Sequence, residues 1–248
     1  ETRQISTDLF DNGFAQYEIN GQQGLVVAEG TQIEVERPVW RAADGMIDLP
    51  TGSDPMAALE LWAPPLYMAD VETGTLTQRG GANLSLRSLH PDTDGFSGPI
   101  TIERDAEIRV DPGQTIDIRN GLRSMDIDGR LIAPGGTINL VNDTGTSVGA
   151  SNAVMLRIGE NAVLDVSGDS FVATDVQGRR FGLVRDGGTI NLGSDRRSRH
   201  PSTHLYQISP LAIVIEDGSY LDLSGGGETL LDIYPDKSGV AVAGDGGT

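Results

Sequence analysis

The clearest pattern in the sequence is a short apolar run, then a turn containing Gly, Asp or Asn, then a run in which apolar and polar residues alternate. It occurs as VVAEGTQIEV at 26–35, TIERDAEIRV at 101–110, LRIGENAVLDVSG at 156–168 and VIEDGSYLDLSG at 214–225. Alternation with a period of two places successive side chains on opposite faces of a strand. The apolar set is Ile33, Val35, Ile108, Val110, Leu164, Val166, Leu221 and Leu223, and the polar set between them is Glu34, Arg109, Asp165 and Asp222. Each copy predicts two short strands, the second with one buried face.

A second motif, GGTINL, occurs at 135–140 and at 187–192, and the chain closes on Gly246-Gly247-Thr248, the start of a third copy. The glycines, which are Gly135, Gly136, Gly187 and Gly188, predict a corner that needs backbone freedom. After the corner, Ile138 and Leu140 are expected to face inward. Asn139 and Asn191 are expected to face outward and to share amide hydrogen bonds along a ladder.

The spacing of these motifs predicts a solenoid. From residue 108 onwards each motif recurs every 52–59 residues, and the two motifs alternate every 24–33 residues. Such a unit buries its apolar face only by stacking on its neighbours. With about 25 residues in a coil, we expect about ten coils and, at about 4.8 Å per coil, a rod roughly 50 Å long. Asp165 and Asp222 are then expected to be separated by an intervening coil.

The predicted fold is therefore all-β, a parallel β-helix with loops outside the helix. We treat residues 1–248 as a single segment, with less regular coils in 1–100 and regular repeats in 101–248. Because the third GGTINL copy is interrupted, we expect the segment to belong to a longer protein. Polar stretches rich in Gly, Pro, Ser and Asp predict loops at 37–55, 64–75, 88–98, 141–152 and 193–209. Residues 54–62 predict a short helix or turn, with Asp54 as its cap and Pro55 at its first position.

The composition excludes several classes of protein. The net charge of −18 argues against a nucleic-acid partner, because phosphate contacts need a basic surface. The chain has no cysteine, so neither disulfides nor thiolate chemistry are available. No apolar run is long enough to predict a membrane-spanning helix. The 33 glycines indicate many turns.

The motifs at 125–140, 158–168, 178–194 and 214–225, together with LELWAPPLYMADVETGTLTQRGGANLSLRS at 59–88, resemble the central region of filamentous-haemagglutinin-like large exoproteins. The resemblance implies a right-handed parallel β-helix, a handedness that general strand chirality also favours. It further implies two-partner secretion through an outer-membrane partner, location at the bacterial cell surface, and a role in adhesion, biofilm formation or contact-dependent competition. The secretion domain and the toxin domain of that family are not recognisable in this sequence.

Two motifs suggest metal ligands. Asp126-Ile-Asp128-Gly129 and Asp92-Thr-Asp94-Gly95 resemble the first half of a calcium loop, but neither is followed by the remaining ligands. We favour a turn in which Asp accepts backbone hydrogen bonds. His200 and His204 are four residues apart, but Pro201 between them argues against a zinc-binding helix. We predict no metal and no cofactor.

Three further groups are candidates for binding or catalysis. Arg196, Arg197 and Arg199 form a basic cluster that is able to bind acidic glycans or to pair with surface carboxylates. Asp165 and Asp222 hold equivalent outward positions, and a carbohydrate-active enzyme would need such carboxylates clustered in a groove. Because Glu34 and Arg109 hold the matching positions, we favour a solvated outer face. The aromatic residues near the loops are candidates for stacking on sugars or for fastening the loops, and they are Trp40, Trp62, Tyr67 and Phe96.

The leading functional prediction is a structural rod segment of a secreted exoprotein, without enzymatic activity. Its predicted partners are the outer-membrane secretion partner of the parent chain and glycans or receptors of host or neighbouring cells. Two alternatives stay open. The segment itself is a glycan- or receptor-binding module, or it is a β-helix carbohydrate-active enzyme.

Overall fold

The computed structural model describes residues 3–88, 98–121, 123–143, 154–195, 211–232 and 238–248. Within these ranges the chain is all-β, with β-strands and three short 3-10 helices and no α-helix. The predicted all-β class is confirmed. Fifteen of the strands form three parallel five-stranded sheets, and the other eight form four antiparallel hairpins.

The three parallel sheets contain one strand from each passage of the chain. Sheet A consists of β1 (Gln16–Asn20), β8 (Asn83–Ser88), β11 (Thr115–Asn120), β14 (Thr137–Asp143) and β19 (Thr189–Asp195). Sheet B consists of β2 (Leu25–Val27), β9 (Ile100–Ile102), β12 (Met125–Ile127), β15 (Val154–Ile158) and β20 (Leu211–Ile215). Sheet C consists of β3 (Gln32–Val35), β10 (Glu107–Val110), β13 (Arg130–Ile132), β16 (Val163–Asp165) and β21 (Tyr220–Asp222).

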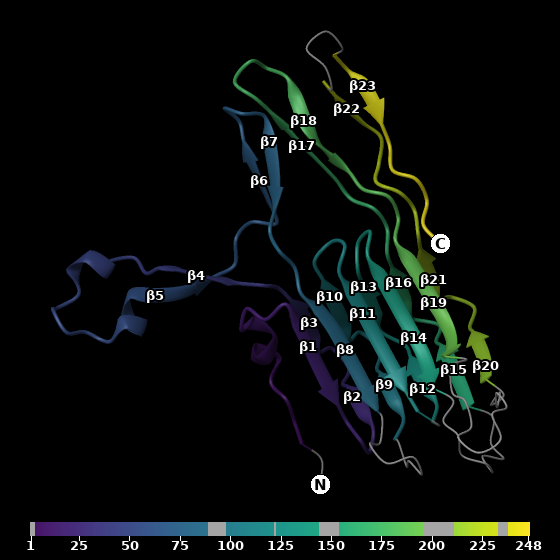
Figure 1. Ribbon diagram of the computed structural model, residues 1–248. Helices are drawn as coiled ribbons and strands as arrows, with labels where there is room; N and C mark the ends of the chain where they lie inside the picture. Colours follow the sequence, from purple (N-terminus) through teal and green to yellow (C-terminus); the bar gives the residue numbers. More distant parts are fainter. Residues whose placement is uncertain (1–2, 89–97, 122, 144–153, 196–210, 233–237) are drawn as a thin grey trace, which may run out of the picture.

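The chain visits sheets A, B and C in the same order five times, and we call each passage a coil (Figure 1). The prediction of about ten coils is therefore wrong. The two GGTINL copies lie directly side by side, because Ile138 pairs with Ile190 across 52 residues. The two sequence motifs belong to one coil, GGTINL to sheet A and the other motif to sheets B and C. Five coils at about 4.8 Å each give a stack of roughly 24 Å.

Ladders of apolar side chains fill the space between the sheets. Leu84, Ile116 and Ile138 stack in sheet A, Ile102, Ile127 and Ile158 in sheet B, and Ile108, Leu131 and Leu164 in sheet C. All nine are at most 1% exposed. Each fully buried Leu or Ile contributes about 1.5–3 kcal/mol. The inward orientation predicted for Ile138, Leu140, Leu164 and Val166 is confirmed, whereas Leu221 and Leu223 in the last coil are only partly buried.

The three corners of the coil differ in what they carry. The corner between sheets B and C is a turn of two or four residues in all five coils. The hairpins all leave the corner between sheets C and A. They are β4 (Val39–Ala42) with β5 (Leu59–Trp62), β6 (Tyr67–Asp70) with β7 (Thr75–Gln78), β17 (Ser170–Thr174) with β18 (Arg180–Val184), and β22 (Thr229–Leu231) with β23 (Val240–Val242). These hairpins lengthen some coils to more than 50 residues, while the coil from Thr115 to Thr137 has 22. Because the coils differ so much in length, the assumption of about 25 residues in every coil overestimated the number of coils.

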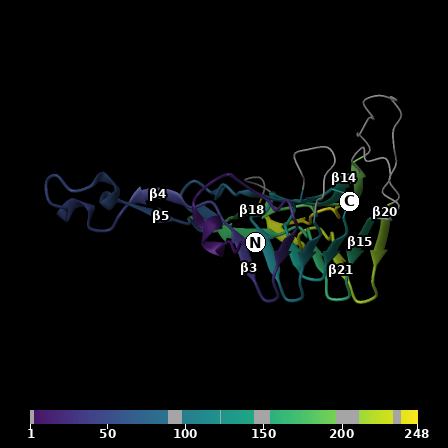
Figure 2. The same ribbon diagram turned by 90° about the horizontal axis from the view of Figure 1, so that it is seen from below.

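One hairpin stands apart from the others (Figures 1 and 2). The β4–β5 hairpin projects away from the stack to the left of Figure 1, whereas the other three hairpins lie together at the top of that view. The tip of the projecting hairpin contains the 3-10 helices η2 (Met46–Asp48) and η3 (Pro55–Ala58). Asp54 caps η3 as predicted, accepting from Met56 N at 2.9 Å, but the predicted helix ends at Ala58 and continues as strand β5.

The predicted loops contain more regular structure than expected. Segment 37–55 contains β4 and η2, and 64–75 contains β6, since these residues pair in hairpins. Strands β14 and β19 extend into the segments predicted as loops from residues 141 and 193. Most of 88–98, 141–152 and 193–209 lies outside the described residues.

The glycines of the GGTINL corner have a different role from the predicted one. Only Gly135 has a left-handed backbone, with φ of 56°. A Cβ atom at Gly188 would lie 2.0 Å from the carbonyl oxygen of Gly136. At Gly187 it would lie 2.2 Å from the carbonyl oxygen of Leu223. These positions need glycine because one backbone packs directly on another. The predicted outward ladder is confirmed, with Asn191 Nδ2 donating to Asn139 Oδ1 at 2.8 Å.

Candidate functional site

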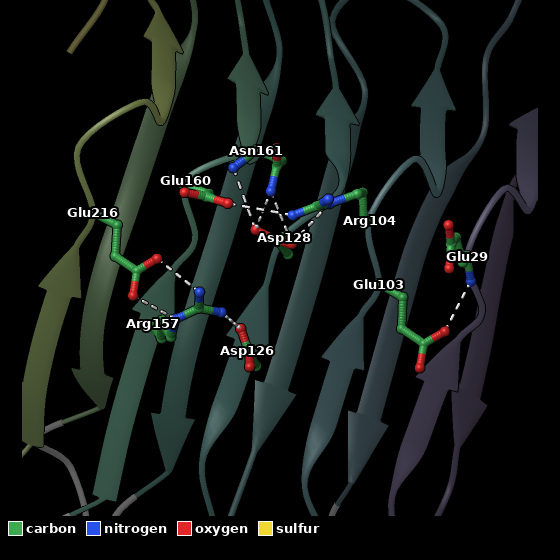
Figure 3. Close-up of polar contacts among 9 residues, drawn as sticks. All are labelled: Glu29, Glu103, Arg104, Asp126, Asp128, Arg157, Glu160, Asn161 and Glu216. Carbon is green, nitrogen blue, oxygen red and sulfur yellow. Dashed lines mark hydrogen bonds and ion pairs between the residues drawn. The ribbon is translucent and has the colours of Figure 1, made fainter.

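The short turns between sheets B and C form one charged edge along the stack, which we call the acidic edge (Figure 3). The residues that make its contacts are Glu29, Glu103, Arg104, Asp128, Glu160, Asn161 and Glu216 in the turns, with Asp126 and Arg157 in the adjoining strands β12 and β15. Each turn begins where a short apolar strand of sheet B ends, so polar residues of successive coils lie one above another. The edge therefore has the regular spacing of the sheets themselves.

Arg157 in the fourth coil joins three coils at this edge. Its Nη1 donates to Asp126 Oδ1 at 2.6 Å in the third coil. Its Nε and Nη2 donate to the two carboxylate oxygens of Glu216 in the fifth coil, at 2.8 and 2.7 Å. The bidentate pair lowers the pKa of the Glu216 carboxyl below its usual 4.5. Arg157 thus fixes the register of neighbouring coils.

Asp128 is a second junction of the acidic edge. Both its carboxylate oxygens accept from Asn161 Nδ2, at 3.3 and 3.2 Å, and Oδ1 also accepts from Asn161 N at 3.3 Å. Arg104 lies 3.8 Å from Asp128 and donates to Glu160 at 3.3 Å. Towards the first coil, Glu103 accepts from the backbone N–H of Glu29 at 2.9 Å. Nearly every contact links one coil to another, so the edge acts as a brace.

Asp126 and Asp128, which match the first half of a calcium loop, use their carboxylates in these contacts. Their carboxylates face Arg157, Asn161 and Arg104 instead of converging on one point. The described residues contain no group of three or more metal-ligating side chains able to hold an ion. Asp128 and Gly129 do form the turn between β12 and β13, but the backbone hydrogen bond that Asp128 accepts comes from Asn161 of the next coil and not from its own turn.

Asp165 and Asp222 are direct neighbours, which corrects the sequence prediction that an intervening coil separates them. Strand β16 pairs with β21, and the register places Asp165 opposite Asp222. Each carboxylate closes its own turn, because Asp165 accepts from Ser167 N and Oγ and Asp222 accepts from Ser224 N and Oγ. The Ser224 hydrogen bonds hold the pKa of the Asp222 carboxyl below its usual value. The pair resembles two stacked turn caps, each bonded to the serine two residues further on.

A cluster between the hairpins was not found from the sequence. Tyr67 Oη donates a short hydrogen bond to Asp169, and Arg185 donates to Asp169 at 3.0 Å and to Gln78 at 2.5 Å. The Tyr67 and Phe171 rings lie 5.0 Å apart. Burial and the Asp169 hydrogen bond raise the pKa of Tyr67 to about 12. The cluster, which we call the hairpin clamp, ties β6–β7 to β17–β18.

Another buried contact fixes the base of the first two hairpins. Arg79, whose side chain is 10% exposed, donates to Asp111 through Nε and Nη2 and to Glu36 through Nη2. Removing one partner from such a pair leaves a buried charge unpaired. The contact joins Glu36 and Arg79 of the first coil to Asp111 of the second coil, and these residues are far apart in the sequence, so no local pattern predicts it.

The remaining candidates are only partly placed by the structure. Arg196, Arg197, Arg199, His200, His204, Asp92, Asp94 and Phe96 lie outside the described residues. Tyr67 fastens a hairpin, as one interpretation of the aromatic residues predicts. Trp40 is 54% exposed on the projecting hairpin, and Trp62 lies under the Arg41 guanidinium at 4.9 Å. No helix in the described ranges has the length and apolar character needed to cross a membrane.

No protein-family model, no curated protein and no solved structure matches this chain. The resemblance to filamentous-haemagglutinin-like exoproteins therefore remains a prediction from the quoted motifs.

Proposed function

We propose that the chain forms a right-handed parallel β-helix and serves as a structural rod segment of a secreted bacterial surface exoprotein. The observation that carries the proposal is the repeated passage through three parallel sheets in register. A stack of this kind transmits load along its axis through backbone hydrogen bonds and apolar ladders, and it needs no ligand.

The contacts between coils support this role. The acidic edge uses its charges to join successive coils, with Arg157 bridging the third, fourth and fifth. Sheet A adds the Asn139–Asn191 hydrogen bond on its outer face. Side chains that an enzyme or a binding site would direct towards a ligand are, on this edge, directed towards the neighbouring coil.

The parent protein would be exported through an outer-membrane secretion partner and displayed at the cell surface. In that setting, the segment would hold an adhesive or effector region away from the membrane. The role in adhesion, biofilm formation or contact-dependent competition would then belong to the whole exoprotein.

The test is binding of the purified, labelled chain to cells and to a glycan panel, at low and at physiological salt. A rod segment shows no saturable binding while circular dichroism confirms its β structure. Saturable binding that is lost in the Arg196/Arg197/Arg199→Ala variant would establish the adhesive alternative instead. Release of soluble sugars from a panel glycan, lost in Asp165→Asn/Asp222→Asn, would establish the enzymatic alternative.

A further inference from the structure

The projecting β4–β5 hairpin, residues 39–62, carries an unusual share of exposed apolar surface, and we call it the arm. Eight of the 22 large apolar side chains that are exposed among the described residues lie in it. They are Val39, Trp40, Met46, Ile47, Leu49, Met56, Leu59 and Leu61. Ile47 at the tip is 92% exposed. Concentration of this kind marks an interaction surface, whereas single exposed apolar residues do not.

The two faces of the arm differ in chemistry. Strand pairing places Arg41 opposite Glu60 on one face, where they form an ion pair at 2.5 Å and Arg41 covers the Trp62 ring. The other face, which we call the apolar face, consists of Trp40, Ala42, Leu59 and Leu61 and has no charged residue. Trp40 lies opposite Leu61 in the ribbon, and Ala42 opposite Leu59.

The described part of the chain covers this face only in part, since Trp40, Leu59 and Leu61 are 54%, 40% and 39% exposed. A two-stranded ribbon without a packed face is marginally stable in water. Trp40, Leu59 and Leu61 together present on the order of 300 Å². That area is below the roughly 800 Å² per partner of a standard interface and suits a weak, concentration-dependent one.

We propose that the apolar face binds the same face of a second copy of this chain, with the two arms antiparallel. A charge-free face is best covered by another charge-free face, because burying an unpaired charge is costly. The surface is self-complementary in this arrangement, as a two-fold interface requires. Because the arm projects from the stack, contact between two arms does not require the two acidic stacks to meet.

The charges at the two ends of the arm select the antiparallel direction. The tip carries the exposed carboxylates Asp44, Asp48 and Asp54, and the base carries the exposed Arg37, which pairs with no described acidic residue. Arg37 precedes Arg41 by four residues and Asp44 follows it by three, so the two residues flank β4 on either side. A two-fold axis near residue 41 therefore brings Arg37 of one copy next to Asp44 of the other. Parallel arms would instead gather six carboxylates at one end.

The experiment is sedimentation velocity of the purified chain over a range from micromolar to several hundred micromolar. We expect a monomer–dimer equilibrium that Trp40→Ser/Leu61→Ser weakens about 100-fold, since central aromatic and aliphatic residues dominate interface energy. Val26→Ser/Val214→Ser removes equally exposed apolar side chains from sheet B and is the matched control. Circular dichroism confirms that each variant is folded.

Charge reversal tests the direction of the arms. Arg37→Asp and Asp44→Arg alone should each weaken the dimer about tenfold, and the two together should restore it to within about threefold. A monomer at every concentration would overturn the proposal, as would association that Trp40→Ser/Leu61→Ser leaves unchanged. Loss of the dimer in both single reversals without recovery in the double variant would overturn the antiparallel arrangement.

Discussion

At the residue scale, the sharpest constraint on this chain is the contact of one glycine with another. Gly188 packs on the Gly136 carbonyl, and Gly247 packs in the same way on Gly188, where a Cβ would lie 1.9 Å from its carbonyl oxygen. The spacing between coils is fixed by backbone hydrogen bonds, so the coils are unable to separate to admit a methyl group.

We therefore expect Gly188→Ala to lower the free energy of unfolding by about 1–3 kcal/mol, the usual cost of overpacking. Gly193, in strand β19, which begins directly after Gly188, has no atom within 4 Å of its Cβ position and supplies the control. Urea titration of both variants measures the difference. Equal stabilities of Gly188→Ala and Gly193→Ala would show that the coils shift enough to make room for the methyl group.

The Arg157–Glu216 contact makes part of the stability depend on pH. Because the folded pKa of Glu216 lies below 4.5, its contribution is full above pH 4.5 and is lost as the pH falls through the folded value. The stability difference between wild type and Glu216→Gln should accordingly shrink below pH 4.5. Glu228→Gln, at an exposed carboxylate with no described partner, is the matched control. Urea unfolding at a series of pH values provides the comparison.

Some residue positions could be predicted from the sequence and others could not. Strand alternation predicted the inward orientation of Ile138 and Leu164 and the Asn139–Asn191 ladder, because each depends on a short stretch of chain. The adjacency of Asp165 and Asp222 was missed, because it depends on how many residues leave the coil at one corner. The Tyr67–Asp169 contact joins residues 102 positions apart and has no local signal.

At the scale of elements, the hairpins form a layer of their own that the stack does not require. The hairpin clamp connects β6–β7 to β17–β18, and Asp232 connects β22–β23 to β18 by accepting from Arg180 N at 2.7 Å and Gly239 N at 2.6 Å. Those hydrogen bonds lower the pKa of Asp232 to about 2. The hairpins are thus held by a few polar contacts, whereas the sheets are held by continuous ladders.

Tyr67→Phe should loosen two hairpins without disturbing the coils, because it removes the hydroxyl that binds Asp169. We expect amide hydrogen exchange in β6–β7 and β17–β18 to accelerate about tenfold, in line with about 1–1.5 kcal/mol for one hydrogen bond. Exchange in β11 and β14 should not change. Tyr220→Phe, which removes an exposed hydroxyl bonded within its own strand, is the control. Faster exchange in β11 would mean that the clamp supports the stack as well.

At the scale of the whole molecule, the two ends of the stack are unlike. Phe10 in η1 (Thr7–Asp11) covers the first coil, where Val27 and Ile33 are 5% and 8% exposed. In the last coil, Ile213 and Ile215 continue the ladders of Leu156 and Ile158 but are 44% and 52% exposed.

Opening of the stack should consequently begin at the last coil. We expect amides of β20 and β21 to exchange at least tenfold faster than those of β2 and β3, as measured by mass spectrometry of peptides from each coil. Phe10→Ala should remove most of this asymmetry by exposing the first coil. Equal exchange at the two ends of the wild-type stack would contradict the expectation.

The corner between sheets B and C is short in every coil, so differences in chain length between coils arise at the other two corners. Between Thr115 and Thr137 the chain uses 22 residues to advance by one strand, and between Thr137 and Thr189 it uses 52 to advance by the same amount. Insertions and deletions at the other two corners change chain length without changing the height of the stack. Length polymorphism is therefore free to accumulate there, and a foreign peptide grafted into a hairpin turn would be displayed at a fixed height along the rod.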